Sequence, residues 1–434
     1  MRIRIADGRI LSVEAGANAP DGAERIRGAA LPGLPNLHSH CFQRGMAGLA
    51  ERRGPASDSF WTWRQVMYRF LERLDPDDVE AIAAMAMVEM LEGGFTSLAE
   101  FHYLHHAPDG SAYDNPAELS GRIVAAAAET GIGLTLLPVA YAQGGFGGAA
   151  PVAGQRRFIN TLEGFLRLRE AAGRFAANGP GLVLGVAPHS LRAVTPDQLA
   201  AILAGCPEGP VHIHIAEQMR EVEDCLAWSG QRPVEWLMTH AAVDPRWCLV
   251  HATHMTAEET RSVAASGAVA GLCPITEANL GDGLFPGADF AARGGTFGVG
   301  SDSNVEISAA AELRLYEYGQ RLFRRERNVL AAHEGQSTGE ALYSAALAGG
   351  ARALARNVGA LAPGLSADIV VLDIDHPALA PIDAEHWLDA YVFVAGVGAI
   401  KTVFAAGRTV VDAGRHVARE RIASRFIERL ARLT

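Results

Sequence analysis

The chain has 434 residues, 49% hydrophobic and 20% charged, and its 38 Lys and Arg against 49 Asp and Glu give a net charge of −11. This composition is typical of a globular protein, and the acidic balance argues against a general nucleic-acid-binding or membrane-binding surface. The length exceeds the usual size of one hydrophobic core, so we expect one large α/β unit and a smaller domain.

The cysteines and the N-terminal residues indicate the compartment. Five cysteines, odd in number and without a C-x-x-C pair, are typical of a reducing environment. The first residues, MRIRIADGRI, contain no apolar signal segment, and no apolar run approaches the length of a membrane span. We therefore expect a cytoplasmic protein.

Short strands and turns are predicted at both ends of the chain. Residues 2–13 alternate around an Asp-Gly turn, and a similar pattern returns at residues 367–375 and 402–414. Hairpins at the two ends can pair into one sheet. We therefore predict a small composite β-sandwich domain from residues 1–30 and 360–434, whose last helix, 419–433, docks on the protein or forms a subunit contact. Residues 31–359 form the other domain.

Helical and strand-like segments alternate between these ends. Residues 75–92 predict a helix with Asp75 as N-cap before Pro76 and Gly93 at its end. Short, uniformly apolar strands separated by helices are typical of a parallel sheet that is covered on both faces, and about eight such units predict a (β/α)8 barrel. Further helices are predicted at 119–130, 158–178 and 196–203, and further strands at 96–101, 134–139, 182–187, 211–215, 249–251, 268–272 and 297–300.

The glycine-rich stretch 141–154 has neither helical nor strand periodicity. It lacks the Lys-Ser/Thr ending of a phosphate-binding loop. We interpret it as a mobile loop over a site.

Polar residues follow nearly every predicted strand. In such barrels the chemistry lies at the C-terminal ends of the strands. For each of these residues alone, a structural role as a hydrogen-bonded side chain or helix cap is the better interpretation, but their coincidence at strand ends predicts a functional site. They are His38, His40, Glu100, His102, His189, His214, Glu217, His251, Ser301 and Asp302.

Four of these residues form a candidate metal site. His38 and His40 are two apart on one strand and therefore share a face. His214 is the outer histidine of V-H-I-H-I, whereas His212 is expected in the barrel interior, and Asp302 completes the set. Three nitrogens and one oxygen suit zinc, with iron(II) or manganese as alternatives. No lysine ends a central strand, so we expect a single ion.

Several motifs together resemble the amidohydrolase superfamily. H-S-H on the first strand, HIHIAEQ (212–218), LVHATH (249–254), CPITEANLGDG (273–283) and GVGSDS (298–303) carry the general resemblance. The stretches LPNLHSHCFQRGMAGLAE, SFWTWR (59–64), PHSLRAV (188–194) and RPVEWL (232–237) resemble more closely its formimidoylglutamate deiminases, over essentially the whole chain.

The resemblance implies a metal-dependent homodimer that hydrolyses N-formimino-L-glutamate to N-formyl-L-glutamate and ammonia. Asp302 is then the general base, Glu217 shuttles the proton to the leaving nitrogen, and His251 stabilises the tetrahedral state. The expected substrate-binding residues are Gln43, Arg64, Tyr103, His189 and Arg192, of which the two arginines suit carboxylates.

Other functions remain open at this point. A deaminase of a purine or pyrimidine is expected to have an apolar binding pocket in place of the paired arginines. The shorter substrate formiminoaspartate would bind to the same two arginines. A hydrolase of amides or chlorinated rings and a metal-free scaffold are further alternatives. A second metal at His102, His105 and His106 is a weaker hypothesis, and Glu277, Asn279 and Asp282 read as loop-shaping residues.

Overall fold

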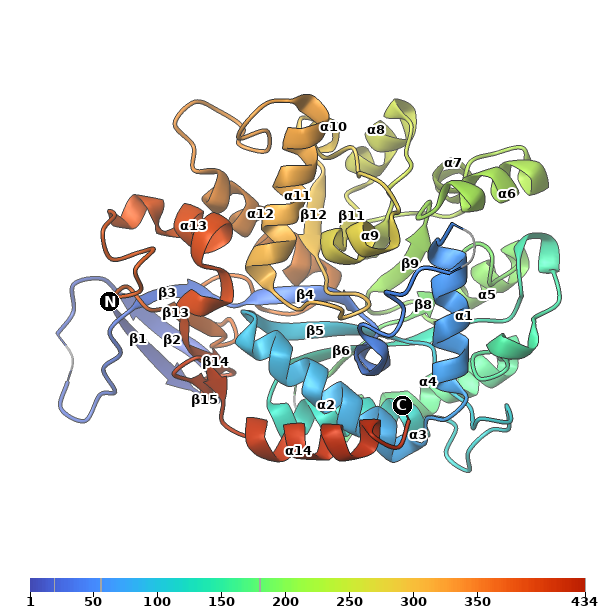
Figure 1. Ribbon diagram of the computed structural model, residues 1–434, viewed down its shortest axis with the longest axis horizontal. Coiled ribbons are helices and arrows are strands. Elements are labelled where there is room, and N and C mark those ends of the chain that lie inside the picture. Colours follow the sequence, from blue (N-terminus) through green and yellow to red (C-terminus); the bar gives the residue numbers. More distant parts are fainter. Residues whose placement is uncertain (19, 55–56, 179–180, 434) are drawn as a thin grey trace.

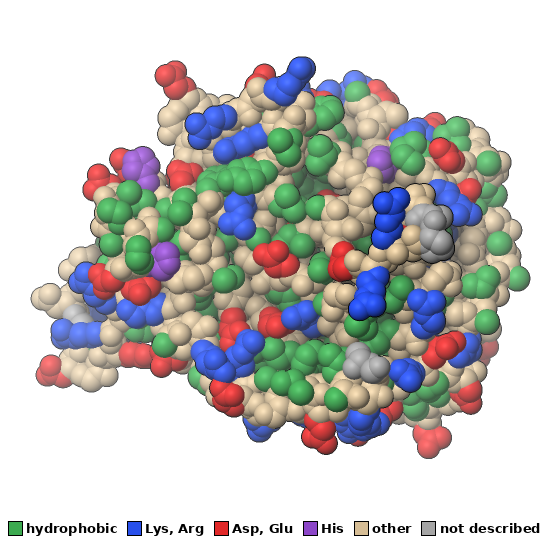
Figure 2. Space-filling model, in the orientation of Figure 1, with side chains coloured by type: hydrophobic (Ala, Val, Ile, Leu, Met, Phe, Trp, Pro, Cys, Tyr) green, Lys and Arg blue, Asp and Glu red, His purple; other side chains and the backbone are tan. Residues whose placement is uncertain are grey.

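The computed structural model describes residues 1–18, 20–54, 57–178 and 181–433. In this part of the chain no helix is both long and apolar enough to cross a bilayer. On the face drawn in Figure 2, acidic and basic side chains are interspersed, and neither sign covers the surface alone.

Parallel strands form the centre of the molecule (Figure 1). One sheet runs β4-β5-β6-β7, with β8 also paired to β6, and a second runs β12-β11-β10-β9. These strands correspond to the predicted barrel units, although the segment predicted at 182–187 is divided into β7 and β8. Their bounds are β4 Leu34–Ser39, β5 Phe95–His102, β6 Gly133–Ala140, β7 Val183–Leu184, β8 Ala187–Pro188, β9 Val211–Ile215, β10 Trp247–His251, β11 Val269–Leu272 and β12 Thr296–Val299.

Backbone hydrogen bonds join the two sheets into a barrel. On one side, His212 N–H donates to Val186 O at 3.1 Å, and His214 N–H donates to His189 O at 3.0 Å. On the other side, Asp302 N–H donates to His38 O and His40 N–H donates to Asp302 O, both at 3.0 Å. The second seam therefore places the end of the first barrel strand directly beside the end of the last. The predicted (β/α)8 barrel is confirmed.

Helices surround these strands (Figure 1). The helix α2 begins after the N-cap Asp75, whose side chain accepts from Asp78 N–H, and ends at Gly93, as predicted. The helix predicted at 158–178 begins later, because the Arg157 carbonyl accepts the N–H groups of His105 and His106 instead of a helical partner. The bounds are α1 Phe60–Leu71, α2 Pro76–Glu92, α3 Glu118–Thr130, α4 Leu162–Asn178, α5 Pro196–Gly205, α6 Met219–Ser229, α7 Pro233–His240, α8 Ala257–Ser266, α9 Pro274–Leu280, α10 Gly287–Ala291, α11 Ala309–Arg324 and α12 Thr338–Ala353.

The two ends of the chain meet in an antiparallel sheet of order β16-β15-β14-β13-β3, and β1 and β2 form a separate hairpin. Ile3 of this hairpin packs on Ile369, Val371 and Phe404, so the two layers share a small core. The predicted pairing of the termini is thus confirmed. The bounds are β1 Arg2–Ala6, β2 Arg9–Glu14, β3 Ala29–Pro32, β13 Ile369–Leu372, β14 Ile400–Ala405, β15 Arg408–Asp412 and β16 Arg415–His416.

We propose that residues 1–30 with 360–434 and residues 31–359 are the two domains. The composite sheet supports this division, although β3 reaches two residues past the first boundary. The last helix, α14 (Arg419–Leu430), lies along α2 (Figure 1), where Arg429 pairs with Asp77 at 2.8 Å and Ile422 is buried. This helix therefore docks on the barrel domain.

Candidate active site

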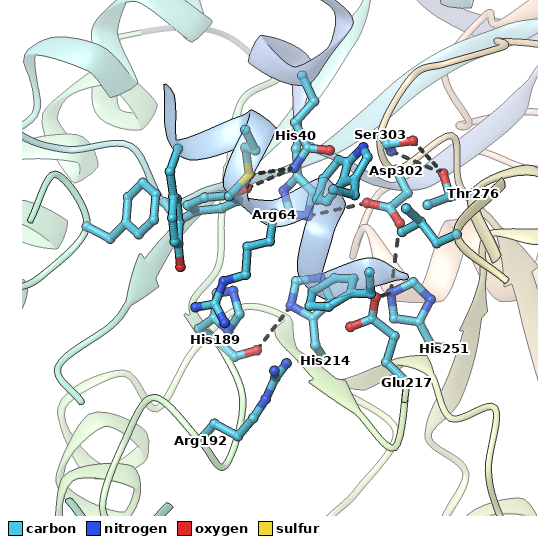
Figure 3. A pocket seen from close by; sticks show the side chains of 18 of the residues that line it. His40, Arg64, His189, Arg192, His214, Glu217, His251, Thr276, Asp302 and Ser303 are labelled. Atoms are coloured by element: carbon cyan, nitrogen blue, oxygen red, sulfur yellow. Dashed lines mark hydrogen bonds and ion pairs between the residues drawn. The ribbon is translucent and has the colours of Figure 1, made fainter. Parts of the chain in front are cut away.

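A pocket of about 580 Å³, including its mouth, opens at the C-terminal ends of the barrel strands. Figure 3 shows His40, His214, Glu217, His251 and Asp302 converging on it, with Arg64 and Arg192 approaching from another side. The lining residues are His40, Gln43, Phe60, Trp63, Arg64, Met67, Tyr68, Tyr103, Tyr141, Phe158, His189, Arg192, His214, Glu217, His251, Thr276, Leu280, Asp302 and Ser303.

Three imidazoles meet at the base of this pocket, and we call His38, His40 and His214 the imidazole cluster. The Nε2 atom of His38 lies 3.2 Å from that of His40 and 3.1 Å from that of His214. All three side chains are buried. Burial lowers the pKa of His40 to about 3 and lowers the pKa of His38 and His214 well below the usual value, so the rings are neutral.

The outer nitrogens fix the tautomers of two of these rings. His40 Nδ1 donates to Phe101 O at 2.9 Å, and His214 Nδ1 donates to His189 O at 3.2 Å, because a carbonyl can only accept. Both Nε2 atoms then carry lone pairs that point toward His38. Converging lone pairs in a buried site fit a cation, and ligating histidines typically donate their other N–H to a carbonyl in this way.

Asp302 supplies an oxygen next to the imidazole cluster. Its Oδ1 lies 3.6 Å from His38 Nε2 and 3.4 Å from His40 Nε2. This donor set of three nitrogens and one oxygen fits a divalent ion of the zinc type. Burial raises the pKa of Asp302 to about 7, an effect that the nearby Glu217 reinforces and that His251 opposes.

A buried carboxamide holds the two strands that carry this site. Asn304 Nδ2 donates to Asp302 O at 2.9 Å and to His40 O and Ser39 Oγ at 3.1 Å, and its Oδ1 accepts from Ser301 Oγ at 2.7 Å. Asn304 has a φ of 57°, a left-handed conformation that asparagine adopts more readily than most residues. It therefore links the last barrel strand to the first.

Glu217, His251 and Asp302 form an acid–imidazole group beside the imidazole cluster. His251 Nε2 lies 3.8 Å from both Glu217 Oε1 and Asp302 Oδ2, and His251 Nδ1 lies 3.2 Å from Glu277 Oε1. Burial alone would lower the pKa of His251, but Glu217, Glu277 and Asp302 together raise it to about 10. In this arrangement His251 is a cation between carboxylates.

Two guanidinium groups lie on another side of the pocket, which we call the arginine side. Arg64 Nη2 donates to Tyr141 OH at 3.1 Å, and Arg64 and Arg192 flank the Trp61 ring, 5.7 and 5.8 Å from its centre. Neither arginine forms an ion pair with a carboxylate among the described residues, and Arg192 Nε is buried without a partner. Such groups are available to an anionic ligand.

The remaining expected substrate contacts also line the pocket. Gln43 Nε2 donates to Tyr103 OH at 2.8 Å, and Gln43 Oε1 is buried without a hydrogen-bond partner. The His189 ring is tilted against the Tyr141 ring, with ring centres 4.5 Å apart. Among the described residues the Gln43 Oε1 atom therefore has no donor, and it belongs to a side chain that lines the pocket.

Some sequence expectations for the site differ from the structure. Glu100 and His102 do not line the pocket, because β5 turns Phe101 toward His38 and His214, while Glu100 accepts from Cys41 N–H at 2.8 Å. His105 and His106 each donate Nε2–H to a backbone carbonyl at 2.9 Å, which is a structural role and gives no support to a second metal there. His212 likewise donates to Ala353 O at 2.8 Å within the buried interior.

The sequence interpretation missed several residues around the site. Glu277 contacts His251 from α9, and Thr276 and Ser303 line the pocket with their hydroxyl oxygens 3.0 Å apart. A charged glutamate, Glu277, close to the apolar start of CPITEANL was the sequence feature that could have indicated a role in the site. The glycine-rich loop does reach the pocket through Tyr141, and its mobility stays a hypothesis.

Comparisons with known proteins agree with this architecture. A model of the amidohydrolase family matches residues 29–410. The formimidoylglutamate deiminase of Pseudomonas aeruginosa is 54% identical over 429 residues, which cover 99% of this chain and 94% of the relative. The 8-oxoguanine deaminase of the same organism is 28% identical over 86% of this chain and 81% of the relative.

A solved structure resembles the whole chain. The crystal structure of an amidohydrolase from Brucella melitensis superposes with a TM-score of 0.94 at 53% sequence identity, covering 99% of this chain and 95% of the other. Together these comparisons confirm the resemblance inferred from the sequence motifs.

Proposed function

Because the chain belongs to the amidohydrolase family, we propose that it is a metal-dependent deiminase that hydrolyses N-formimino-L-glutamate to N-formyl-L-glutamate and ammonia. The observation that carries this proposal is one pocket that combines a cation-binding donor set with two arginines that form no ion pair within the described part of the chain. The relative of 54% identity acts, by its name, on the same substrate.

We propose that His38, His40, His214 and Asp302 hold one divalent ion and that this ion is zinc, because nitrogen donors outnumber oxygen. When bound, such an ion lowers the pKa of a water molecule toward neutrality and so supplies the nucleophile. The chain's own residues then position that water and move its proton.

Asp302 is the proposed general base. Its Oδ1 lies next to the imidazole cluster, whereas its Oδ2 lies 3.8 Å from His251 Nε2 and can accept a proton from a water molecule beside it. His251, held by Glu277, carries positive charge next to the forming tetrahedral centre and stabilises it.

Glu217 is the proposed acid for the leaving group. It lies three residues past His214 and its carboxylate is 3.8 Å from His251 Nε2, at the edge of the same pocket. Protonation of the imine nitrogen makes the carbon of –NH–CH=NH electrophilic. As water adds, one of its protons passes to Asp302 and then through Glu217 to that nitrogen, and loss of the remaining hydroxyl proton releases ammonia and leaves the formamide –NH–CHO.

The arginine side is proposed to bind the two carboxylates of glutamate. Arg64 and Arg192 can each offer a two-pronged contact, with Tyr103 and His189 as further donors. The free Gln43 Oε1 is placed to accept an N–H of the substrate. Paired guanidinium groups favour a dicarboxylate over a neutral purine or pyrimidine.

We further propose, on the family resemblance, that the protein is a cytoplasmic homodimer with no nucleic-acid or membrane partner. All five cysteines are free, which agrees with a reducing compartment. Light scattering of the purified protein measures the mass in solution, and the mass of one 45.9 kDa chain would contradict the dimer.

The proposed function is tested with a substrate panel. Metal-replete protein is assayed for ammonia release from N-formimino-L-glutamate, N-formimino-L-aspartate, 8-oxoguanine and cytosine. We expect the first substrate to give the highest kcat/KM and equal amounts of ammonia and N-formyl-L-glutamate. Faster release from either heterocycle would overturn the dicarboxylate assignment.

A further inference from the structure

Asp302 faces two separate groups of potential ligands through its two oxygens. Oδ1 is directed to the imidazole cluster, whereas Oδ2 lies 3.8 Å from His251 Nε2. A thiol completes the second group: one donor atom each of His251, Cys273 and Asp302 lie within 4.8 Å of one another, and all three side chains are buried. The proposed mechanism makes no use of this thiol.

We propose that His251, Cys273 and Asp302 form a second cation site, which binds a thiophilic divalent ion such as zinc or cadmium and thereby inhibits the enzyme. This second ion would bind at the same time as the catalytic ion. Asp302 would be a ligand of both ions, one through each of its two oxygens.

The backbone holds Cys273 in place for such a role. It lies between β11 and α9, and its N–H donates to Glu277 Oε1 at 2.9 Å. Its side chain is fully buried and forms no disulfide. The thiol is therefore presented from the end of a barrel strand, as are the other two side chains of the site.

His251 has the hydrogen bonding of a typical metal ligand. Its Nδ1 lies 3.2 Å from Glu277 Oε1, and a histidine that donates one N–H to a carboxylate offers the opposite nitrogen to a metal. That nitrogen, Nε2, is the one that faces Asp302 and Glu217. The same glutamate thus orients both His251 and the backbone of Cys273.

The distances and donor types select the class of ion. In a tetrahedral site with Zn–N and Zn–S bonds of about 2.0 and 2.3 Å, ligand atoms lie roughly 3.3–3.8 Å apart. The His251–Asp302 distance of 3.8 Å is longer than the roughly 3.3 Å of a nitrogen–oxygen pair in such a site, so the two side chains would move slightly closer when the ion binds. Glu217 Oε1, also 3.8 Å from His251 Nε2, is a candidate fourth ligand. A soft sulfur donor disfavours magnesium, calcium and manganese.

Binding at this site would stop catalysis, an effect that rests on the proposed function. The ion would occupy His251 Nε2 and Asp302 Oδ2, the groups proposed to stabilise the tetrahedral state and to accept a proton. The cation forms bonds to Cys273 Sγ and His251 Nε2, and the protons of the thiol and of Nε2 pass to solvent, so no oxidant or reductant is required. The binding itself does not depend on the substrate.

Cadmium titration of the metal-free protein tests the site directly. We expect two cadmium ions per chain and one thiolate-to-cadmium charge-transfer band for the wild type, but one ion and no band for Cys273→Ser. Cys248→Ser, which alters another buried cysteine on the neighbouring strand β10, is the matched control and should keep the band. A single ion without the band in the wild type, or a band that survives Cys273→Ser, would overturn the proposal.

Two further measurements test the site, one of which applies if the cysteine variant does not fold. If Cys273→Ser does not fold, Cys273→Ala is used, and X-ray absorption of the two-zinc wild type should show one sulfur ligand, whose absence overturns the site. In the activity assay, the zinc concentration that halves ammonia release should rise at least about tenfold in Cys273→Ser and stay unchanged in Cys248→Ser. Equal inhibition of all three proteins by zinc would overturn the inhibitory role of the second site. If the wild type releases no ammonia at all, the proposed function fails, but the cadmium titration still tests the second site.

Discussion

The imidazole cluster and the arginine side are held in contrasting ways. The imidazole cluster is buried and lies on β4, directly after β4 and on β9, and two of its rings, His40 and His214, donate outer N–H groups to backbone carbonyls. The arginine side lies outside the strands: Arg64 is on α1, and Arg192 follows β8 in a connection. Both arginines are half-buried and contact mainly aromatic rings.

This difference indicates a division of labour. Groups that carry out chemistry need fixed geometry, and the barrel backbone provides it. The groups that we propose to bind a flexible dicarboxylate lie on surrounding elements, where small movements are tolerated. Substitutions on the two sides should therefore affect different kinetic constants.

The largest loss of activity is expected for a substitution of Asp302, which lies between the imidazole cluster and His251. Asp302→Asn removes the proposed base and weakens the ion site, so kcat/KM should fall by at least about 10³-fold. Asp197→Asn, on the exposed first turn of α5, is the control and should match the wild type. The measurement is ammonia release with zinc titrated to the maximal rate of each protein, and more than a tenth of normal activity in Asp302→Asn would contradict the assignment.

Arg192→Gln should act mainly on substrate binding. Loss of a charge-assisted contact worth about 1.5–3 kcal/mol lowers kcat/KM by roughly 10- to 100-fold, mostly through a higher KM. Lysine at this position should recover only part of the loss, because it lacks the planar fork. Arg261→Gln on the exposed face of α8 is the control. A fall in kcat with an unchanged KM would break the proposed division between the two sides.

Asn304→Ser tests the seam behind the imidazole cluster. The serine side chain cannot reach all three acceptors, so the free energy of unfolding should fall by about 1–3 kcal/mol and metal affinity by roughly tenfold. Metal transfer to a chelator and thermal unfolding measure the two effects. Asn279→Ser, where an exposed asparagine contacts Glu51, should change neither. Normal metal retention in Asn304→Ser would contradict a positioning role.

A smaller, pH-dependent effect is expected at Glu100, behind the first barrel strand. Burial raises its pKa from 4.5 to about 7, so the folded state binds the proton more tightly than the unfolded state. Below pH 4.5 both states are protonated and no penalty exists. As pH rises to about 7 the unfolded state loses its proton first, so the wild type is progressively destabilised, by up to roughly 3 kcal/mol above pH 7.

Glu100→Gln removes this titration while its side-chain oxygen can still accept from Cys41 N–H. The unfolding free energy of the variant relative to the wild type should therefore increase between pH 5 and pH 8. Denaturant unfolding at several pH values measures it, with Glu163→Gln on exposed α4 as the control. A difference that stays constant with pH would show that Glu100 is not buried as described.

The sequence was sufficient for the features that follow from local periodicity. Alternation along one strand places His38 and His40 on the same face, and the polarity of a parallel barrel brings His214 and Asp302 to the same end. The hairpins at the two termini were also recognisable from their turns. These inferences need only the residue periodicity of helices and strands and the rule that the C-terminal ends of parallel barrel strands lie at the same end of the barrel.

Features that depend on contacts between distant segments were beyond the sequence. Asn304 acts across a seam to residues more than 260 positions earlier, and Glu277 reaches His251 from a short helix that was interpreted as a loop. The inward face of β5 was also not determined, since a shift of one residue exchanges Glu100 for Phe101. Periodicity predicts which residues of a helix or strand share a face, but it does not predict which distant residues that face contacts.

The most direct test of the account is restoration of activity by metal. The protein is freed of metal with a chelator, supplied with increasing zinc, and assayed for ammonia release from N-formimino-L-glutamate. We predict negligible release without metal and maximal release at one equivalent per chain, with one N-formyl-L-glutamate for each ammonia. Full activity in the metal-free protein, or no activity with this substrate at any zinc concentration, would contradict the central claim.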